Sequence, residues 1–188
     1  MCNVFLFEVT KHMTALKGGT LLDEFKQLYD KHEKQIYKYL FYLVGNKHLA
    51  EELTQETFFQ AFKSIHRFKG KSKVSTWLFQ IAKNTYYTYM RKNKKIDRNI
   101  DPATIQESLA IQQTPEEIYE KKEESIRLMN AIKKLKQPQQ EIMILRFYNE
   151  LSFKEIGDIF DKTDLWARVN FYRAKGKLSN ILDGGVET

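Results

Sequence analysis

The stretch LSFKEIGDIFDKTDLWARVNFYRAKGKL, residues 151–178, contains two short segments with helical spacing of apolar residues, separated by DKT, where neither pattern continues. Gly157 provides the small residue that two closely crossing helices need where they touch. Asp161 tolerates the left-handed conformation of a tight turn, and Thr163 is a suitable cap for the second helix. The spacing therefore predicts a helix-turn-helix.

The second helix of this pair is predicted to have one buried and one outward side. The buried stripe has helical spacing and comprises Ala167, Phe171, Ala174 and Leu178. The outward residues are Arg168, Val169, Tyr172, Arg173 and Lys175. A face with arginine, tyrosine and lysine near a helix N-terminus suits a DNA major groove. A plain helical hairpin with a solvated basic face has the same periodicity, so the spacing leaves both interpretations open.

The composition of the whole chain favours an all-α fold. Its 188 residues include only 8 glycines and 3 prolines, and no segment shows the alternating pattern of a strand. Lysine and arginine outnumber aspartate and glutamate by 31 to 24, which gives a net charge of +7. A basic chain is attracted to polyanions, so nucleic acid, an anionic membrane surface or merely solvated lysine-rich faces agree with this charge.

Several functional classes lack a signal in the sequence. Cys2 is the single cysteine, so no internal disulfide forms, which suits a reducing cytosol. No apolar run is long enough to span a membrane. His48, Glu52 and Glu56 fall four residues apart, but a carboxylate-bridged metal site needs matching ligands from a second helix. Glycine-rich phosphate loops and nucleophile elbows are absent. We expect no enzyme activity, no metal and no cofactor.

The chain divides into four segments by composition. Residues 1–20 are expected to be peripheral, residues 21–95 and 118–188 to form two small helical domains, and residues 96–117 to form a flexible linker. The linker is polar, lacks aromatic residues and contains Pro102 and Pro115.

Three helices are expected in the first domain. Gly45 and Asn46 end the first, and the second covers 47–65. Ser72 or Ser75 is expected to cap the third. Its predicted buried stripe comprises Trp77, Leu78, Ile81, Thr85 and Tyr89.

Three motifs then occur in a characteristic order: AEELTQETFFQAF at 50–62, RFKGKSKVSTWLFQIAKNTYYTYMRKNKK at 67–95, and LKQPQQEIMILRFYNELSFKEIGDIFDKTDLWARVNFYRAKGKL at 135–178. Together they resemble bacterial RNA polymerase sigma factors, in particular the extracytoplasmic-function (ECF) group of the sigma-70 family. The resemblance identifies residues 21–95 with sigma region 2 and residues 118–188 with sigma region 4.

The resemblance implies roles for individual residues. The first motif would contact core RNA polymerase through Glu52, Gln55 and Glu56. The second would melt the promoter and bind its minus-ten element through Phe68, Lys69, Lys71, Ser72, Asn84, Tyr87, Arg91 and Lys92. The third would bind the minus-thirty-five element through Lys162, Thr163, Leu165, Trp166, Arg168, Val169, Tyr172 and Arg173.

The helix expected to contact the minus-thirty-five element departs from the family pattern. Leu165 and Trp166 stand where the family often has a small threonine or Gly-Thr, and Asn170 replaces a commonly basic residue. Trp166 would pack either on the sugar-phosphate backbone or on the preceding helix.

The function implied by the resemblance is transcription initiation. The protein would bind core RNA polymerase, direct it to specific promoters and help to melt the DNA, acting in the cytoplasm without stable membrane insertion. An anti-sigma factor is a further expected partner, and the free chain is expected to be a monomer. One alternative is a helix-turn-helix regulator that is not a polymerase subunit, and another is a helical interaction protein with no DNA role.

Overall fold

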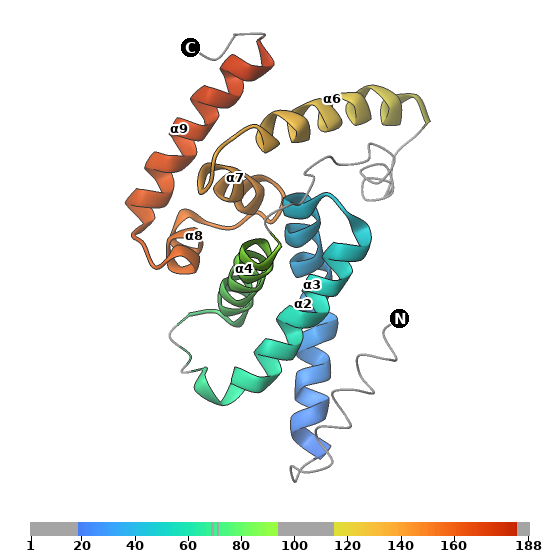
Figure 1. Cartoon of the computed structure of the whole chain (residues 1–188), viewed down its shortest axis with the longest axis vertical. Coiled ribbons are helices and arrows are strands. Elements are labelled where there is room, and N and C mark those ends of the chain that lie inside the picture. Colours follow the sequence, from blue (N-terminus) through green and yellow to red (C-terminus); the bar gives the residue numbers. More distant parts are fainter. Residues whose placement is uncertain (1–18, 69, 71, 94–114, 184–188) are drawn as a thin grey trace.

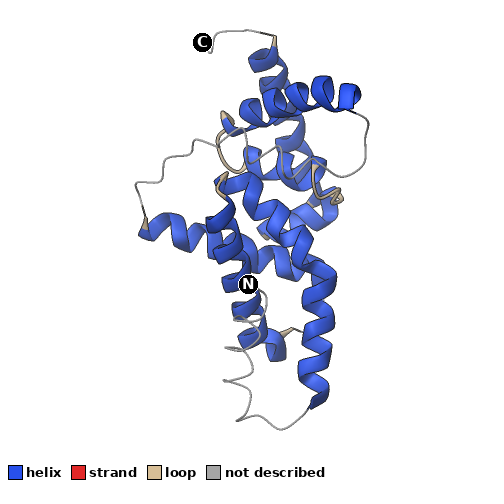
Figure 2. Ribbon diagram, turned by 90° about the vertical axis from the view of Figure 1, so that its right-hand side faces the viewer, coloured by secondary structure: helices blue, strands red, loops and turns tan. Residues whose placement is uncertain are grey.

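The computed structural model describes residues 19–68, 70, 72–93 and 115–183, and all the secondary-structure elements in these ranges are helices (Figures 1 and 2). The all-α prediction is confirmed. Most of the expected peripheral segment 1–20 and linker 96–117 lies outside the described residues, although helices begin at Gly19 and at Pro115. Among the helices in the described ranges, none has both the length and the apolar character needed to cross a membrane.

The N-terminal half consists of α2 (Gly19–Val44), α3 (Lys47–Ser64), the short 3-10 helix η1 (Ile65–Arg67) and α4 (Val74–Lys92). The turn between α2 and α3 forms where the sequence predicts it. Gly45 has a φ of 69°, in the left-handed region that favours glycine, and the side chain of Asn46 accepts a hydrogen bond from the Leu49 N–H at 2.9 Å. The two helices therefore fold back on each other.

Aromatic side chains fill the core between these helices. Phe58 of α3 packs against Tyr29 of α2 with ring centroids 4.7 Å apart, and it also meets Phe25 edge-on at 6.4 Å. Phe79 of α4 meets Tyr39 of α2 edge-on at 5.5 Å. These contacts fix α3 and α4 against α2.

The buried stripe predicted for α4 is wrong in most of its members. Of the predicted residues only Leu78 is buried, and Trp77, Ile81, Thr85 and Tyr89 are half-buried. The buried residues of α4 are Thr76, Leu78, Phe79, Ala82 and Tyr86. The stripe is displaced because α4 contacts α2 and α3 on one side and α8 of the C-terminal half on another.

The predicted cap of α4 is also wrong. Lys73 occupies the cap position, and its carbonyl accepts the first helical hydrogen bond, from the Trp77 N–H at 3.1 Å. Ser75 therefore lies inside the first turn and Ser72 lies one residue before the cap. No side chain caps this helix.

The C-terminal half consists of α6 (Pro115–Lys133), α7 (Gln139–Phe147), α8 (Phe153–Phe160) and α9 (Asp164–Leu182). Helix α6 contributes Met129 and Ile132 to the core, and Leu135 just after it is also buried. The long helix α9 packs against α6, α7 and α8 (Figure 1).

The helix-turn-helix prediction is confirmed in its details. Ser152 and Glu155 form a reciprocal capping box at the start of α8, and Asp161 ends that helix in the left-handed conformation with a φ of 54°. Thr163 caps α9 by accepting a hydrogen bond from the Trp166 N–H at 3.2 Å. The predicted stripe of α9 is buried in all four positions, Ala167, Phe171, Ala174 and Leu178.

The two halves of the chain also contact each other directly. Helix α7 packs on α2 and α8 packs on α4, so that the buried apolar residues of both halves form one continuous core. Figure 1 shows α8 beside α4, although the two helices are far apart in the sequence. The position of the helix-turn-helix is therefore fixed by packing as well as by the chain connection.

We expect the Gly157→Ala substitution to destabilise the helix-turn-helix. An added Cβ would lie 2.8 Å from the Lys162 carbonyl oxygen and 2.9 Å from backbone atoms of Thr163, which cannot shift without deforming the turn. Unfolding in urea, followed by circular dichroism, should show a loss of about 1–3 kcal/mol.

Gly176→Ala in α9 is the matched control. Nothing lies within 4 Å of its added Cβ, so the better helix propensity of alanine should stabilise the protein by roughly 0.5–1 kcal/mol. Equal effects of the two substitutions would contradict the close approach at Gly157.

Candidate nucleic-acid interface

The outward face of α9 combines apolar and basic side chains. Leu165 is 64% exposed, Val169 37% and Tyr172 57%, which are high values for large apolar residues. Lys162, Thr163, Arg168 and Arg173 are exposed on or just before the same helix. All eight residues predicted for the minus-thirty-five element therefore lie at the start or along one helix, and only Trp166 among them is half-buried.

The structure decides between the two positions considered for Trp166. Its indole packs on Phe160 of the preceding helix, with ring centroids 5.3 Å apart. The neighbouring Asn170 donates its side-chain amide to the Trp166 carbonyl at 2.9 Å. The guanidinium of Arg168 lies 5.0 Å above the ring of Phe153 at the start of α8. Trp166 and Arg168 thus help to join α8 and α9, whereas the Asn170 bond lies within α9.

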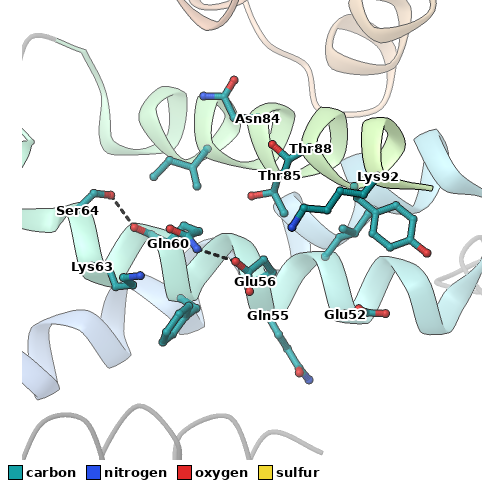
Figure 3. Close-up of a pocket in the computed structure, with 14 residues that line it drawn as sticks. Glu52, Gln55, Glu56, Gln60, Lys63, Ser64, Asn84, Thr85, Thr88 and Lys92 are labelled. Atoms are coloured by element: carbon teal, nitrogen blue, oxygen red, sulfur yellow. Dashed lines mark hydrogen bonds between the residues drawn. The ribbon is translucent and has the colours of Figure 1, made fainter. Parts of the chain in front are cut away.

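A groove of about 980 Å³ separates α3 from α4 (Figure 3). Glu52, Gln55 and Glu56, predicted to contact polymerase, line it from α3, and Asn84 and Lys92, predicted to contact DNA, line it from α4. In Figure 3, Lys92 extends from α4 towards α3, whereas Gln55 points away from α4. The two predicted sites in this half are therefore adjacent.

The predicted promoter-melting loop lies at the N-terminal end of α4. Phe68 packs against Trp77 with ring centroids 5.2 Å apart, which places Trp77 in the packing of this loop. Lys69 and Lys71 lie outside the described residues, and Ser72 is half-buried. Asn84, Tyr87, Arg91 and Lys92 follow along the same helix and are exposed.

The row of His48, Glu52 and Glu56 does not form a metal centre. His48 instead lies 4.0 Å from Glu51. Within the described ranges, the structure contains no group of three or more histidine, cysteine, aspartate or glutamate residues that could hold a metal ion.

Comparison with known proteins assigns both halves to one family. The model of sigma-70 region 2 matches residues 28–96, and that of sigma-70 region 4 matches residues 125–178. The ECF RNA polymerase sigma factor SigM of Bacillus subtilis (strain 168) is 31% identical over 163 residues, covering 85% of this chain and 96% of SigM. SigW of the same organism is 30% identical over 161 residues, covering 81% and 85%.

The chain belongs to the ECF RNA polymerase sigma factors. It is a transcription initiation factor, and the alternative of a regulator that is not a polymerase subunit is not favoured. Sigma factors are in general initiation factors rather than catalytic enzymes.

Two solved structures have the same fold. The sigma factor RpoE, in complex with the anti-sigma factor NepR from Bartonella quintana, matches with a TM-score of 0.67 and 20% identity, covering 85% of this chain and 97% of that one. CnrH, in complex with the cytosolic domain of CnrY, matches with a TM-score of 0.65 and 18% identity, covering 97% of each chain.

A buried carboxylate links regions 2 and 4 of this sigma factor. Glu141 of α7 is fully buried and accepts hydrogen bonds from the hydroxyl of Tyr39 in α2, at 2.9 Å, and from the hydroxyl of Tyr87 in α4. Burial raises the pKa of Glu141, although the two hydroxyl donors and the charge of Lys83 act in the opposite direction. Burial and the nearby carboxylate raise the pKa of both tyrosines.

Side chains of α4 also bind the C-terminal end of α8. Gln80 donates to the Asp158 carbonyl at 2.6 Å, and Lys83 donates to the Ile159 carbonyl at 2.5 Å. The last carbonyls of a helix lack intrahelical partners and carry partial negative charge, so an amide and a cation suit this position. The ammonium of Lys83 also lies 4.7 Å above the Phe160 ring.

The sequence analysis did not identify these contacts between the two regions. In the sequence, Glu141 is only a charged residue directly before the apolar run IMIL at 142–145. No contact was predicted for Lys83. Their partners are more than 50 residues away in sequence, as the separations of 102 for Tyr39 and 76 for Ile159 show.

Glu155 of α8, which pairs with Lys73 just before α4, makes a pH-dependent contribution to the stability of the folded state. Burial raises its pKa, but hydrogen bonds from Lys73 at 2.8 Å and from Ser152 outweigh burial and lower the pKa to about 2, from an ordinary value of 4.5. A lowered carboxylate pKa stabilises the folded state above pH 4.5, and this stabilisation is lost as the pH falls from 4.5 towards 2.

We expect Glu155→Gln to lower the midpoint of urea unfolding at pH 7. The substitution should also remove the loss of stability that protonation of Glu155 causes below pH 4.5. Glutamine retains the hydrogen-bonding shape of the capping box but not the charge. A double-mutant cycle with Lys73→Ala, measured at pH 7 and near pH 2, should give a coupling that is clearly smaller at the lower pH, where protonation of Glu155 begins to remove its charge. Identical acid profiles for the wild type and Glu155→Gln would contradict this assignment.

Proposed function

We propose that regions 2 and 4 of this sigma factor bind different targets during initiation. In region 4, α9 would enter the major groove of the minus-thirty-five element. The observation that carries this proposal is the outward face of α9, which is exposed, carries Arg168 and Arg173, and is held by the cap and turn of a helix-turn-helix. Thr163 and Lys162 precede the helix and would contact phosphates, as helix N-termini do.

Region 2 would bind core polymerase and the minus-ten element on adjacent surfaces. Glu52, Gln55 and Glu56 present an acidic and amide face on a chain whose net charge is +7. Such local charge of opposite sign orients an encounter with a basic partner surface. The loop from Phe68 to Ser72, followed by Asn84, Tyr87, Arg91 and Lys92, would hold the melted strand, because aromatic, amide and cationic groups suit unstacked bases and phosphates.

The proposed domain limits remain those of the sequence analysis, 21–95 and 118–188. We propose that the chain acts by binding alone, is monomeric when free and works in the cytoplasm, where it would meet core polymerase. The solved relatives RpoE and CnrH are bound to NepR and CnrY respectively. We therefore also propose an anti-sigma factor as a partner of this chain.

The function is tested by transcription from a library of promoter fragments. Core polymerase with the protein should initiate at a defined subset that shares two sequence elements, and core polymerase alone should not. Binding to the same fragments that is equally strong with and without core polymerase would overturn the proposal in favour of a free-standing regulator.

Two exposed residues should separate polymerase binding from promoter opening. Glu52→Lys reverses a charge on the proposed polymerase surface and should weaken core binding about tenfold, a change of about 1.4 kcal/mol. Asn84→Ala should leave core binding unchanged but slow open-complex formation, measured by permanganate reactivity of unpaired thymines.

Glu24→Lys is the matched control for charge, because Glu24 is exposed on α2, away from the groove. It should affect neither step. An equal loss of core binding in Glu24→Lys and Glu52→Lys would attribute the effect to net charge and contradict the assignment of Glu52.

A further inference from the structure

The N-terminal part of the outward face of α9 is mainly apolar. Leu165, Val169 and Tyr172 lie four and three residues apart, so they occupy one side of the helix. All three are exposed although they are large apolar residues. Leu165 and Val169 are thus the first two outward side chains of this row, in the part of a recognition helix that meets base edges.

Two polar side chains beside this row, Asn170 and Arg168, make contacts within the protein. Asn170 donates to the Trp166 carbonyl at 2.9 Å, and the Arg168 guanidinium lies 5.0 Å above the Phe153 ring. Trp166 packs on Phe160. These contacts orient Asn170 and Arg168 against the protein, whereas Leu165 and Val169 present exposed apolar side chains on the outward face.

Only one base edge in the major groove offers an apolar group. Thymine presents its C5-methyl group there, and aliphatic side chains recognise it by contact. The charge of the helix favours DNA over an apolar protein groove as the occupant of this face. Helix α9 carries four basic residues, Arg168, Arg173, Lys175 and Lys177, and one acidic residue, Asp164.

We propose that Leu165 and Val169 determine part of the promoter specificity by contacting thymine methyl groups in the minus-thirty-five element. This inference rests on the proposed docking of region 4 in the major groove. It assigns a specificity role to Leu165, where the sequence departs from the family pattern, and to Val169 one turn further along the helix, and it explains why large apolar side chains are left exposed there.

The test uses the holoenzyme and promoter fragments that it selects from a random library. Thymines in the upstream element are replaced by deoxyuridine, which pairs identically but lacks the methyl group. We expect affinity to fall about threefold to fivefold for each thymine methyl in contact. Deoxyuridine placed between the two promoter elements is the control probe and should have no effect.

Protein variants assign the effect to the two side chains. In the double variant Leu165→Ala with Val169→Ala, affinity for the thymine probe should fall and the penalty for deoxyuridine should largely disappear. Asn180→Ala, an exposed substitution near the other end of α9, should change neither value. A penalty that persists undiminished in the double variant would overturn the assignment to these residues.

Two failures are distinguishable. Affinity that depends on base pairs of the upstream element but not on deoxyuridine would overturn methyl recognition and leave the docking of region 4 intact. A holoenzyme that selects no upstream element would overturn both. Unchanged promoter affinity in the double variant, with weakened binding of an anti-sigma factor, would show that the face binds protein instead.

Discussion

The buried carboxylate of Glu141 is the constraint on which the relative position of the two regions depends. Moving an ionised carboxylate out of water costs several kcal/mol unless hydrogen bonds and opposite charge compensate for the loss of hydration. Here the compensation comes from Tyr39, Tyr87 and the charge of Lys83, all of them in region 2. Helix α7 therefore has a favourable place against α2 and α4 only where these hydroxyl groups meet Glu141. The hydrogen bonds thus add a directional constraint to the apolar packing between the two regions.

The close packing of α8 on α9 determines which side chains of α9 are exposed on its outward face. At Gly157 the backbone of the following turn approaches so closely that a Cβ would overlap it. That approach sets the rotation of α9, buries Ala167, Phe171, Ala174 and Leu178, and leaves Leu165, Val169 and Tyr172 exposed. Gly157 and the buried four-residue stripe of α9 thus determine which side chains are exposed to a partner.

Local rules made the helix-turn-helix predictable from the sequence. Gly157, Asp161, Thr163 and the α9 stripe each follow from a requirement satisfied within a few residues. The buried face of α4 was not predictable in this way, because Phe79 and Tyr86 are buried by α2 and by the C-terminal half, whose placement no local pattern records. For the same reason the contact of Lys83 with the end of α8 was not predicted. The outward residues of the candidate site were foreseen, and the contacts between the regions were not.

Tyr87 has two roles that compete, one proposed in DNA binding and one observed in the contact between the regions. The family resemblance places it among the residues that would hold the minus-ten element, yet its hydroxyl donates to Glu141 of region 4. If that hydroxyl donated a hydrogen bond to DNA instead, this bond would be lost, which would leave Glu141 with one donor fewer. Separation of the two regions removes the conflict, because water then hydrates the carboxylate and the net cost of exchanging the hydrogen bonds becomes small. Contacts within a chain that rely on such polar groups resemble transient interfaces. The same hydrogen bonds that make the packed arrangement specific thus add little to the free-energy cost of opening it.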